Sequence, residues 1–112
     1  MLFRSKKYLH RGLTSSDILD TTFSIQLQQS AIIIKMAIVD LLDTLKKLSN
    51  SHKNAVISGR THGMHAELTT FGLVLSTFYS EWSRHLLTIN ELIEHVSYGK
   101  LSGPVEIGRA HV

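Results

Sequence analysis

Two long runs of helical apolar periodicity, with a single proline in 112 residues, point to a fold of long helices. Between residues 14 and 50, apolar residues recur at alternating spacings of four and three, a pattern typical of a helix that packs against another helix. This seam consists of Leu27, Ala31, Ile34, Ile38, Leu41, Leu45 and Leu48. The proline, Pro104, lies beyond both runs and interrupts neither. We therefore predict a first helix from about residue 14 to residue 50.

The second run predicts a helix from about residue 69 to residue 98. Its seam consists of Phe71, Leu75, Phe78, Trp82, Leu86, Ile89, Ile93 and Val96. Polar residues occupy the opposite face. The predicted fold class is all-α: two long antiparallel helices joined by an irregular loop, with a short hairpin arm near the C-terminus at residues 100–104. Residues 56–58 are expected to form a short extended piece before the loop.

The middle of the first helix is apolar on nearly every side. Outside the seam it also carries Ile32, Ile33, Met36, Ala37, Val39 and Leu42. A helix that is apolar all round must be surrounded, and one partner helix cannot surround it. We therefore predict that the chain forms an oligomer, belongs to a larger protein, or both. The alternative is a helical hairpin that self-associates non-specifically.

Composition excludes several classes of protein. Apolar residues make up 43% and charged residues 19%, as in globular proteins, and the absence of cysteine rules out disulfides and thiolate metal sites. The net charge of +3 is too small to indicate a nucleic-acid partner. The longest apolar run, residues 31–39, is interrupted by Lys35 and is too short to span a bilayer, and no signal peptide is visible. We predict neither a nucleic-acid nor a membrane partner.

The segment between the predicted helices, residues 59–67, concentrates polar groups. It reads Gly-Arg-Thr-His-Gly-Met-His-Ala-Glu. Histidine is the natural proton donor near neutral pH, and loops held by rigid helices often carry chemistry. The spacing of His62, His65 and Glu67 also suggests zinc, but no further ligands stand out. We therefore predict no metal site here, with His65 structural or supporting.

The start of the first helix, Thr14-Ser15-Ser16-Asp17, has two interpretations. Hydroxyls and an aspartate in the first turn form a helix cap. The same hydroxyls and N–H groups at the positive end of the helix dipole can bind an anion such as a dicarboxylate. His10 lies just before this start, and His62 lies beyond the far end of the same long helix. The two histidines are expected to share a site only if another subunit supplies one of them.

Three segments together resemble a known family. They are the nine-residue segment with Thr69-Thr70-Phe71-Gly72, the stretch Leu9-His10-x-Gly12-Leu13-Thr14-Ser15-Ser16-Asp17-x-x-Asp20-Thr21, and Gly99-Lys100-Leu101-Ser102-Gly103. The chain resembles the adenylosuccinate lyase family of the fumarase/aspartase superfamily over nearly all of residues 8–105. The resemblance implies helices of a central bundle in a cytoplasmic homotetramer, with three subunits contributing to each active site and no metal or cofactor.

The resemblance also implies roles for individual residues. His62 matches the general acid that protonates the leaving nitrogen, and Thr61 a neighbour that contacts the substrate. Thr14 and Ser15 match the pair that binds the succinyl carboxylates, and His10 a histidine supplied by a different subunit. The implied reaction is the β-elimination of fumarate from adenylosuccinate, or from the succinyl-carboxamide ribotide of purine biosynthesis.

Some family features have no counterpart in this sequence. Leu68 replaces the usual proline after Ala-Glu, and Arg11 often corresponds to tyrosine. The serine-rich loop that carries the catalytic base is absent, as is the N-terminal domain. We therefore expect residues 1–105 to be an internal, inactive fragment. Residues 106–112 read like the translation of a sequencing adapter and are expected to be non-native. The alternatives are another superfamily enzyme, such as a carboxymuconate cycloisomerase-like protein, and a non-catalytic helical self-association module.

Overall fold

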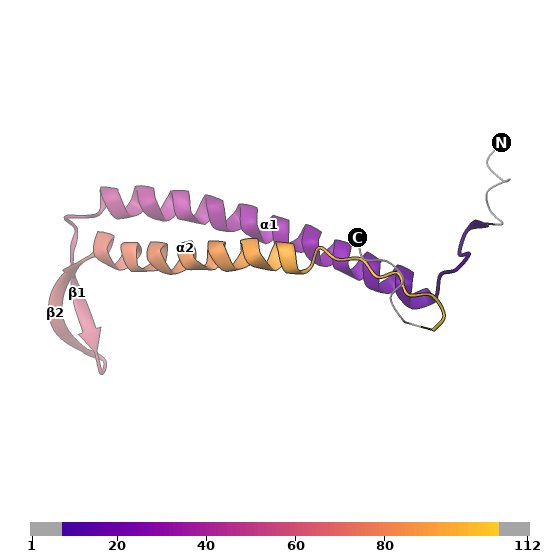
Figure 1. The fold of residues 1–112 in the computed structure, drawn as a ribbon. Helices are drawn as coiled ribbons and strands as arrows, with labels where there is room; N and C mark the ends of the chain where they lie inside the picture. The colour runs from indigo at the N-terminus through magenta and orange to yellow at the C-terminus, as the bar shows by residue number, and fades with distance from the viewer. Residues whose placement is uncertain (1–7, 106–112) are drawn as a thin grey trace. The chain divides into compact units, whose positions relative to one another are not determined.

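The computed structural model describes residues 8–105, which contain two helices and a two-stranded sheet. The elements follow one another as α1 (Ser15–Ser51), β1 (Val56–Thr61), β2 (Met64–Thr70) and α2 (Phe71–His95), as Figure 1 shows. The two predicted long helices are confirmed. The second is shorter than predicted at both ends. The predicted non-native tail, residues 106–112, lies outside the described residues.

The segment between the helices is an antiparallel β-hairpin, so the prediction of an irregular loop was wrong. Strands β1 and β2 pair from Val56 with Thr70 to Thr61 with Met64. The two residues between them, His62 and Gly63, have φ angles of 52° and 73°. Positive φ at both central residues is the conformation of a type I′ turn, whose twist matches that of the paired strands. The expected extended piece at residues 56–58 is confirmed as the first half of β1.

A bulge interrupts the strand pairing beside Gly59. One residue of β1, Gly59, lies opposite two residues of β2, Ala66 and Glu67, because the register changes between Ser58 and Arg60. A Cβ atom at Gly59 would lie 2.9 Å from the Glu67 carbonyl oxygen, closer than real Cβ contacts come. The glycine therefore permits the close approach of the strands, and the bulge increases their local twist.

The predicted hairpin arm near the C-terminus was also wrong, since the hairpin is central. Within the described range, residues 96–105 form turns and irregular backbone. The N–H groups of Lys100, Ser102 and Gly103 donate to side chains of α1 and so do not pair with a strand. Because these partners lie about eighty residues earlier, local sequence does not reveal them.

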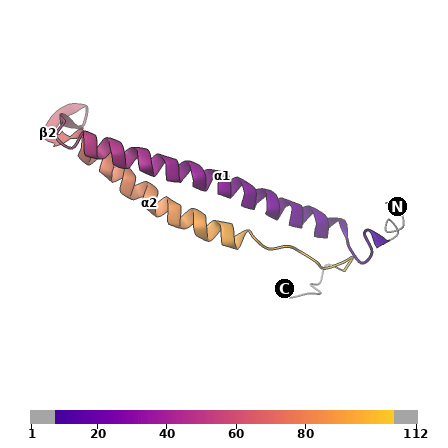
Figure 2. The ribbon, with the colours of Figure 1, turned by 90° about the horizontal axis from the view of Figure 1, so that it is seen from above.

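The chain divides into two compact units, each described here by itself: residues 8–30 with 93–105, and residues 31–92. In the second unit, the C-terminal part of α1 and α2 run side by side in opposite directions, and the hairpin joins them (Figures 1 and 2). Ala31, Ile38 and Leu45 of α1 are buried. Their spacing of seven places them on one face of the helix, which confirms part of the predicted seam.

The two helices of this unit meet closely where α1 ends and α2 begins. Ser49 Oγ donates a hydrogen bond of 2.8 Å to the Gly72 carbonyl, and the Gly72 N–H donates to the His52 carbonyl at 3.0 Å. The His52 and Phe71 rings lie 5.4 Å apart. Gly72 is buried. It lets the two backbones approach more closely than any side chain would permit.

Much of the apolar surface of α1 is exposed in this chain, as the sequence predicts. Leu19, Ile33 and Met36 are 66%, 69% and 64% exposed. An 18-residue stretch of α1 has a mean hydropathy of 1.4 and at most two charged residues, so by length and composition alone α1 could cross a membrane. The core helix of a bundle has the same properties, and the exposed apolar surface of α1 would be buried in such a bundle.

Candidate active site

The start of α1 is capped by its own first turn. Thr14 precedes the helix, and its carbonyl accepts a hydrogen bond from the Asp17 N–H at 3.1 Å. In return, Asp17 Oδ2 accepts the Thr14 N–H at 3.0 Å. A carboxylate at the third helical position that binds the capping residue's N–H forms half of a capping box. The aspartate part of the helix-cap interpretation is therefore confirmed, and the capping role of the hydroxyls stays a prediction.

The Asp17 side chain also holds a distant segment. It is 4% exposed, and its Oδ1 accepts the Ser102 N–H at 2.9 Å and the Ser102 hydroxyl at 3.0 Å. Its Oδ2 accepts the Gly103 N–H at 3.0 Å, beside the bond from Thr14. We call this arrangement of Asp17, Thr14, Ser102 and Gly103 the Asp17 clasp. It joins positions 85 residues apart, and both segments belong to the motifs quoted above.

The clasp stabilises the ionised form of Asp17. The Thr14 N–H bond, followed by the bonds from Ser102 and Gly103, holds the pKa of this carboxyl well below its usual range, although burial acts in the opposite direction. Several N–H groups that donate to one carboxylate favour its charged form more strongly than desolvation disfavours it. Asp17 is therefore an anion throughout the neutral range.

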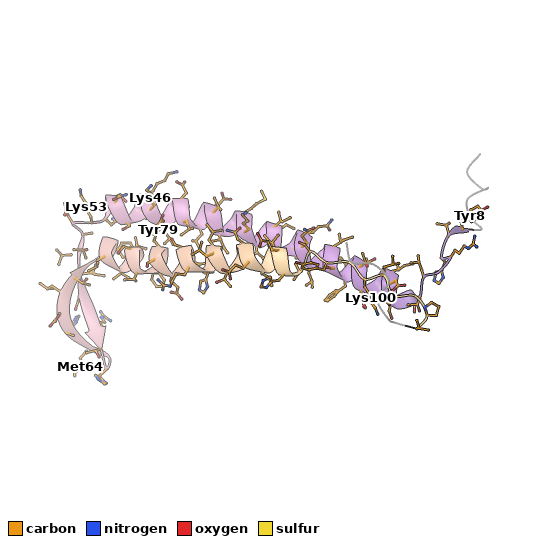
Figure 3. All side chains as sticks on the ribbon, in the orientation of Figure 1. Tyr8, Lys46, Lys53, Met64, Tyr79 and Lys100 are labelled. Atoms are coloured by element: carbon orange, nitrogen blue, oxygen red, sulfur yellow. The ribbon has the colours of Figure 1, made fainter. Side chains whose placement is uncertain are left out.

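A second set of contacts holds the same segment one turn further along α1. The Thr21 hydroxyl donates to the Lys100 carbonyl at 3.3 Å and accepts the Lys100 N–H at 2.9 Å. Lys100 Nζ lies 3.4 Å from Asp20 Oδ2, and Figure 3 shows Lys100 alongside the N-terminal part of α1. Ser24 Oγ donates to the Val96 carbonyl. Sequence reasoning missed these roles, because nothing local relates residues 17–24 to residues 96–103.

The candidate residues at this end of the chain surround the start of α1. His10 is exposed, has a φ of 70°, and accepts the Leu13 N–H through its carbonyl at 3.2 Å. Thr14 is half-buried and Ser15 is exposed. The structure thus places His10, Thr14 and Ser15 within one unit, close together in sequence at the positive end of the helix dipole.

The other candidates, Thr61 and His62, lie at the turn of the hairpin. Both side chains are exposed. His62 occupies the left-handed region, where histidine is found more often than most residues. Figure 3 shows Met64, the residue paired with Thr61, at the end of the hairpin away from the helices. The type I′ turn thereby presents the imidazole on a defined backbone.

His65 has a partner across the hairpin. Its Nδ1 lies 2.7 Å from the Ser58 hydroxyl. This bond restrains the ring, and the backbone of His65 is paired with that of Arg60 across the hairpin. The contact is consistent with the supporting role predicted for His65. Among residues 8–105 no group of three or more histidine, aspartate or glutamate side chains is arranged to hold a metal ion.

The structure does not bring the two groups of candidates into one described unit. His10, Thr14 and Ser15 belong to the first unit, and Thr61 and His62 to the second. That a complete site needs more than one subunit stays a prediction. What the described geometry offers is a helix start suited to an anion and a hairpin turn that carries an imidazole.

Comparison with known proteins identifies related chains. A family model described as lyase matches residues 2–112. The adenylosuccinate lyase of Thermotoga maritima is 42% identical over 105 residues, which cover 94% of this chain. A fumarate lyase from Mesorhizobium sp. BNC1 superposes with a TM-score of 0.85 at 32% identity over 89% of the chain. A 3-carboxy-cis,cis-muconate lactonizing enzyme from Pseudomonas putida gives the same TM-score at 29% identity and the same coverage.

The matched region is a limited part of each relative. The chain spans 24% of the length of the Thermotoga maritima protein, 24% of the Mesorhizobium chain and 23% of the Pseudomonas putida chain. Both solved structures share the arrangement of two long helices and a hairpin over 89% of the present chain.

Proposed function

The chain belongs to the lyase family, and we propose that it forms part of an enzyme that cleaves adenylosuccinate to AMP and fumarate. The observation that carries the proposal is the hairpin that presents Thr61 and His62 at its turn, in a chain 42% identical to an adenylosuccinate lyase. The same chemistry would release fumarate from the succinyl-carboxamide ribotide of purine biosynthesis. Such an enzyme acts in the cytoplasm and needs no metal or organic cofactor.

His62 is proposed as the general acid of an anti β-elimination. A base removes the proton from Cβ of the succinyl group, and the electron pair left on carbon forms the double bond of fumarate. The C–N bond breaks with its electrons going to nitrogen, and the imidazolium of His62 gives that nitrogen a proton. A group that titrates near neutral pH is suited to this transfer. Thr61, next to His62 at the turn, is proposed to contact the substrate.

Thr14 and Ser15 are proposed to bind the succinyl carboxylates. They lie at the start of a 37-residue helix, where N–H groups and the positive end of the dipole favour negative charge. One of these carboxylates stabilises the carbanion as the Cβ proton leaves. Fixed donors at that carboxylate would lower the barrier most, because the charge there grows in the transition state.

The remaining parts of the site are proposed to come from outside this chain. The base is a serine on a loop that has no counterpart here, and His10 is proposed to act in a site shared with other subunits of a homotetramer. The 112-residue chain is therefore expected to release no fumarate by itself. The exposed apolar face of α1 is consistent with burial against other helices in such an assembly.

A hybrid enzyme tests the substrate. Residues 8–105 replace the matching stretch of the Thermotoga maritima adenylosuccinate lyase, to which the chain is 42% identical over 105 residues. We expect the purified tetrameric hybrid to release fumarate and AMP from adenylosuccinate, followed by ultraviolet absorbance and product chromatography. The same preparation is incubated with 3-carboxy-cis,cis-muconate, and we expect no conversion of this compound.

The second candidate function has a specific observation in its favour. The muconate lactonizing enzyme of Pseudomonas putida superposes as well as the fumarate lyase does. Its identity of 29% is lower than the 42% to the adenylosuccinate lyase, which is why the latter function is preferred. An assembled hybrid that lactonizes carboxymuconate and leaves adenylosuccinate intact would overturn the proposal in favour of the cycloisomerase. A hybrid that assembles but acts on neither would favour a non-catalytic role.

The exposed face of α1 leads to a prediction about association. We expect the 112-residue chain to form oligomers at micromolar concentration, because burying apolar surface is favourable by about 25 cal/mol per Å². Replacing Ile33 and Met36 by serine should shift the sedimentation velocity distribution toward monomer. Replacing Lys46 and Lys47 by serine is the matched control, because these residues lie on the same helix but are already polar. This variant should leave the sedimentation velocity distribution unchanged. Oligomers that persist in the Ile33/Met36 variant would contradict this assignment of the interface.

A further inference from the structure

We infer that Asp17 is a positioning residue for the bound diacid, acting through the backbone of Thr14. The inference rests on the proposed function of Thr14 and Ser15 and adds a residue that the reaction scheme does not use. Asp17 is the buried carboxylate of the start of α1, and its two oxygens accept four hydrogen bonds. A buried charge with this many donors fixes the groups that surround it.

The two carboxylate oxygens of Asp17 bind different parts of the chain. Oδ2 accepts the N–H of Thr14, from the start of α1, and the N–H of Gly103, from the C-terminal segment. One atom thus joins the substrate-binding end of the helix to a segment 86 residues away. Oδ1 accepts both donors of Ser102 and sets the rotation of the carboxylate. The position of the Thr14 backbone is therefore determined from two directions, not by the helix alone.

The same arrangement reduces an electrostatic conflict. A carboxylate in the first turn would repel a dicarboxylate that binds at the same helix end. Four donors aimed at Asp17 offset its charge locally, and the side chain is 4% exposed. The segment containing Ser102 and Gly103 is thus inferred to support the anion site through Asp17, although neither residue is proposed to touch the substrate.

Replacing Asp17 by asparagine distinguishes the effect of losing the hydrogen bonds of the clasp from the effect of changing the volume of the side chain. Asp17→Asn keeps the shape but leaves one carbonyl oxygen and introduces an NH₂ donor. In one orientation the NH₂ group faces the N–H of Ser102, and in the other it faces the N–H groups of Thr14 and Gly103. Because an NH₂ group accepts no hydrogen bond, some of these bonds are lost in either orientation. Ser102→Ala is the milder variant, because it removes the hydroxyl bond and keeps every backbone donor.

Steady-state kinetics of the hybrid enzyme test the inference. We expect Asp17→Asn to raise both the KM for adenylosuccinate and the inhibition constant of succinate about tenfold, because hydrogen bonds to charged groups are stronger than those between neutral groups. Ser102→Ala removes one such bond and should raise both constants about threefold. The fall in kcat should be smaller than the rise in KM. Asp43→Asn, which removes the same charge from an exposed ion pair with Lys47 elsewhere on α1, should leave both constants unchanged.

Other outcomes overturn the inference. If Asp17→Asn and Ser102→Ala lower only the amount of assembled enzyme and leave KM and the succinate inhibition constant unchanged, Asp17 serves stability alone. Amide hydrogen exchange of the full 112-residue chain gives a readout without activity. The Thr14, Ser102 and Gly103 amides should exchange at least tenfold faster in Asp17→Asn, and equal rates would refute the clasp. A parent hybrid that releases no fumarate refutes the proposed function instead.

Discussion

Replacing His62 by asparagine is expected to lower kcat of the hybrid enzyme for adenylosuccinate by about 10²- to 10⁴-fold, the usual contribution of a general acid. Asparagine tolerates the left-handed backbone conformation that His62 adopts, with φ at 52°, so the type I′ turn should persist. It cannot supply a proton near neutral pH. The variant therefore removes the proposed chemistry while it keeps the hairpin. Fumarate release under saturating substrate measures the effect.

The matched control for this variant is His95→Asn, at the C-terminal end of α2. His95 is exposed and lies outside the proposed site, so kcat should stay within twofold of the parent value. Circular dichroism and sedimentation of both variants should match the parent, because neither position packs in the interior. If His62→Asn retains more than a tenth of the parental kcat, His62 is not the acid that protonates the leaving nitrogen.

Replacing Gly72 by alanine is expected to reduce the free energy of unfolding by about 3 kcal/mol, near the upper end for overpacked sites. A Cβ atom there would lie 2.5 Å from the Ser49 carbonyl oxygen and 2.7 Å from Lys53 Cα. Both are backbone atoms, which cannot rotate away as side chains can. The gain in helix propensity from glycine to alanine is at most about 1 kcal/mol. The clash therefore outweighs it, and urea unfolding of the full chain, followed by circular dichroism, measures the difference.

Gly99→Ala is the matched control for the packing argument. The nearest atom to a Cβ at Gly99 would be Thr21 Cγ2 at 3.4 Å, which is ordinary van der Waals contact. This substitution should change the free energy of unfolding by less than about 0.5 kcal/mol, as for most substitutions without a specific mechanism. Equal stability of Gly72→Ala and the parent chain would show that the two helices separate enough to admit a methyl group.

The helices could be predicted from the sequence because their information is local and periodic. The spacing of Ala31, Ile38 and Leu45 identifies a buried face without knowledge of the partner. The end of β2 was harder to predict. Thr69 and Thr70 fit a helical pattern but pair with β1, and the Thr70 hydroxyl instead accepts the Leu73 N–H at the start of α2. A capping threonine before an apolar run was the available signal.

The hairpin turn could have been recognised from its two central residues. Asn-Gly and Asp-Gly are the usual signals for a type I′ turn, and His62-Gly63 was not recognised as one. Histidine, like asparagine, enters the left-handed region more readily than most residues, so the pair is a weaker form of the same signal. His62 therefore has a conformational role in the turn in addition to the chemical role predicted for its imidazole.

The Asp17 clasp could be only half predicted. The bond from Asp17 to the Thr14 N–H follows from spacing within one helical turn. The bonds to Ser102 and Gly103 depend on how two distant segments meet, and no periodicity encodes them. The motifs at residues 9–21 and 99–103 contain every residue of the clasp. A sequence motif does not indicate which of its residues are in contact.

Fumarate release from adenylosuccinate by the tetrameric hybrid, compared with the Thermotoga maritima parent in the same assay, tests the central claim most directly. If residues 8–105 supply the acid and the carboxylate-binding helix start, the hybrid should turn over adenylosuccinate within about tenfold of the parent, a difference of about 1.4 kcal/mol in the barrier. The His62→Asn hybrid should be nearly inactive. A correctly assembled hybrid that produces no fumarate, while the parent does, would contradict the account.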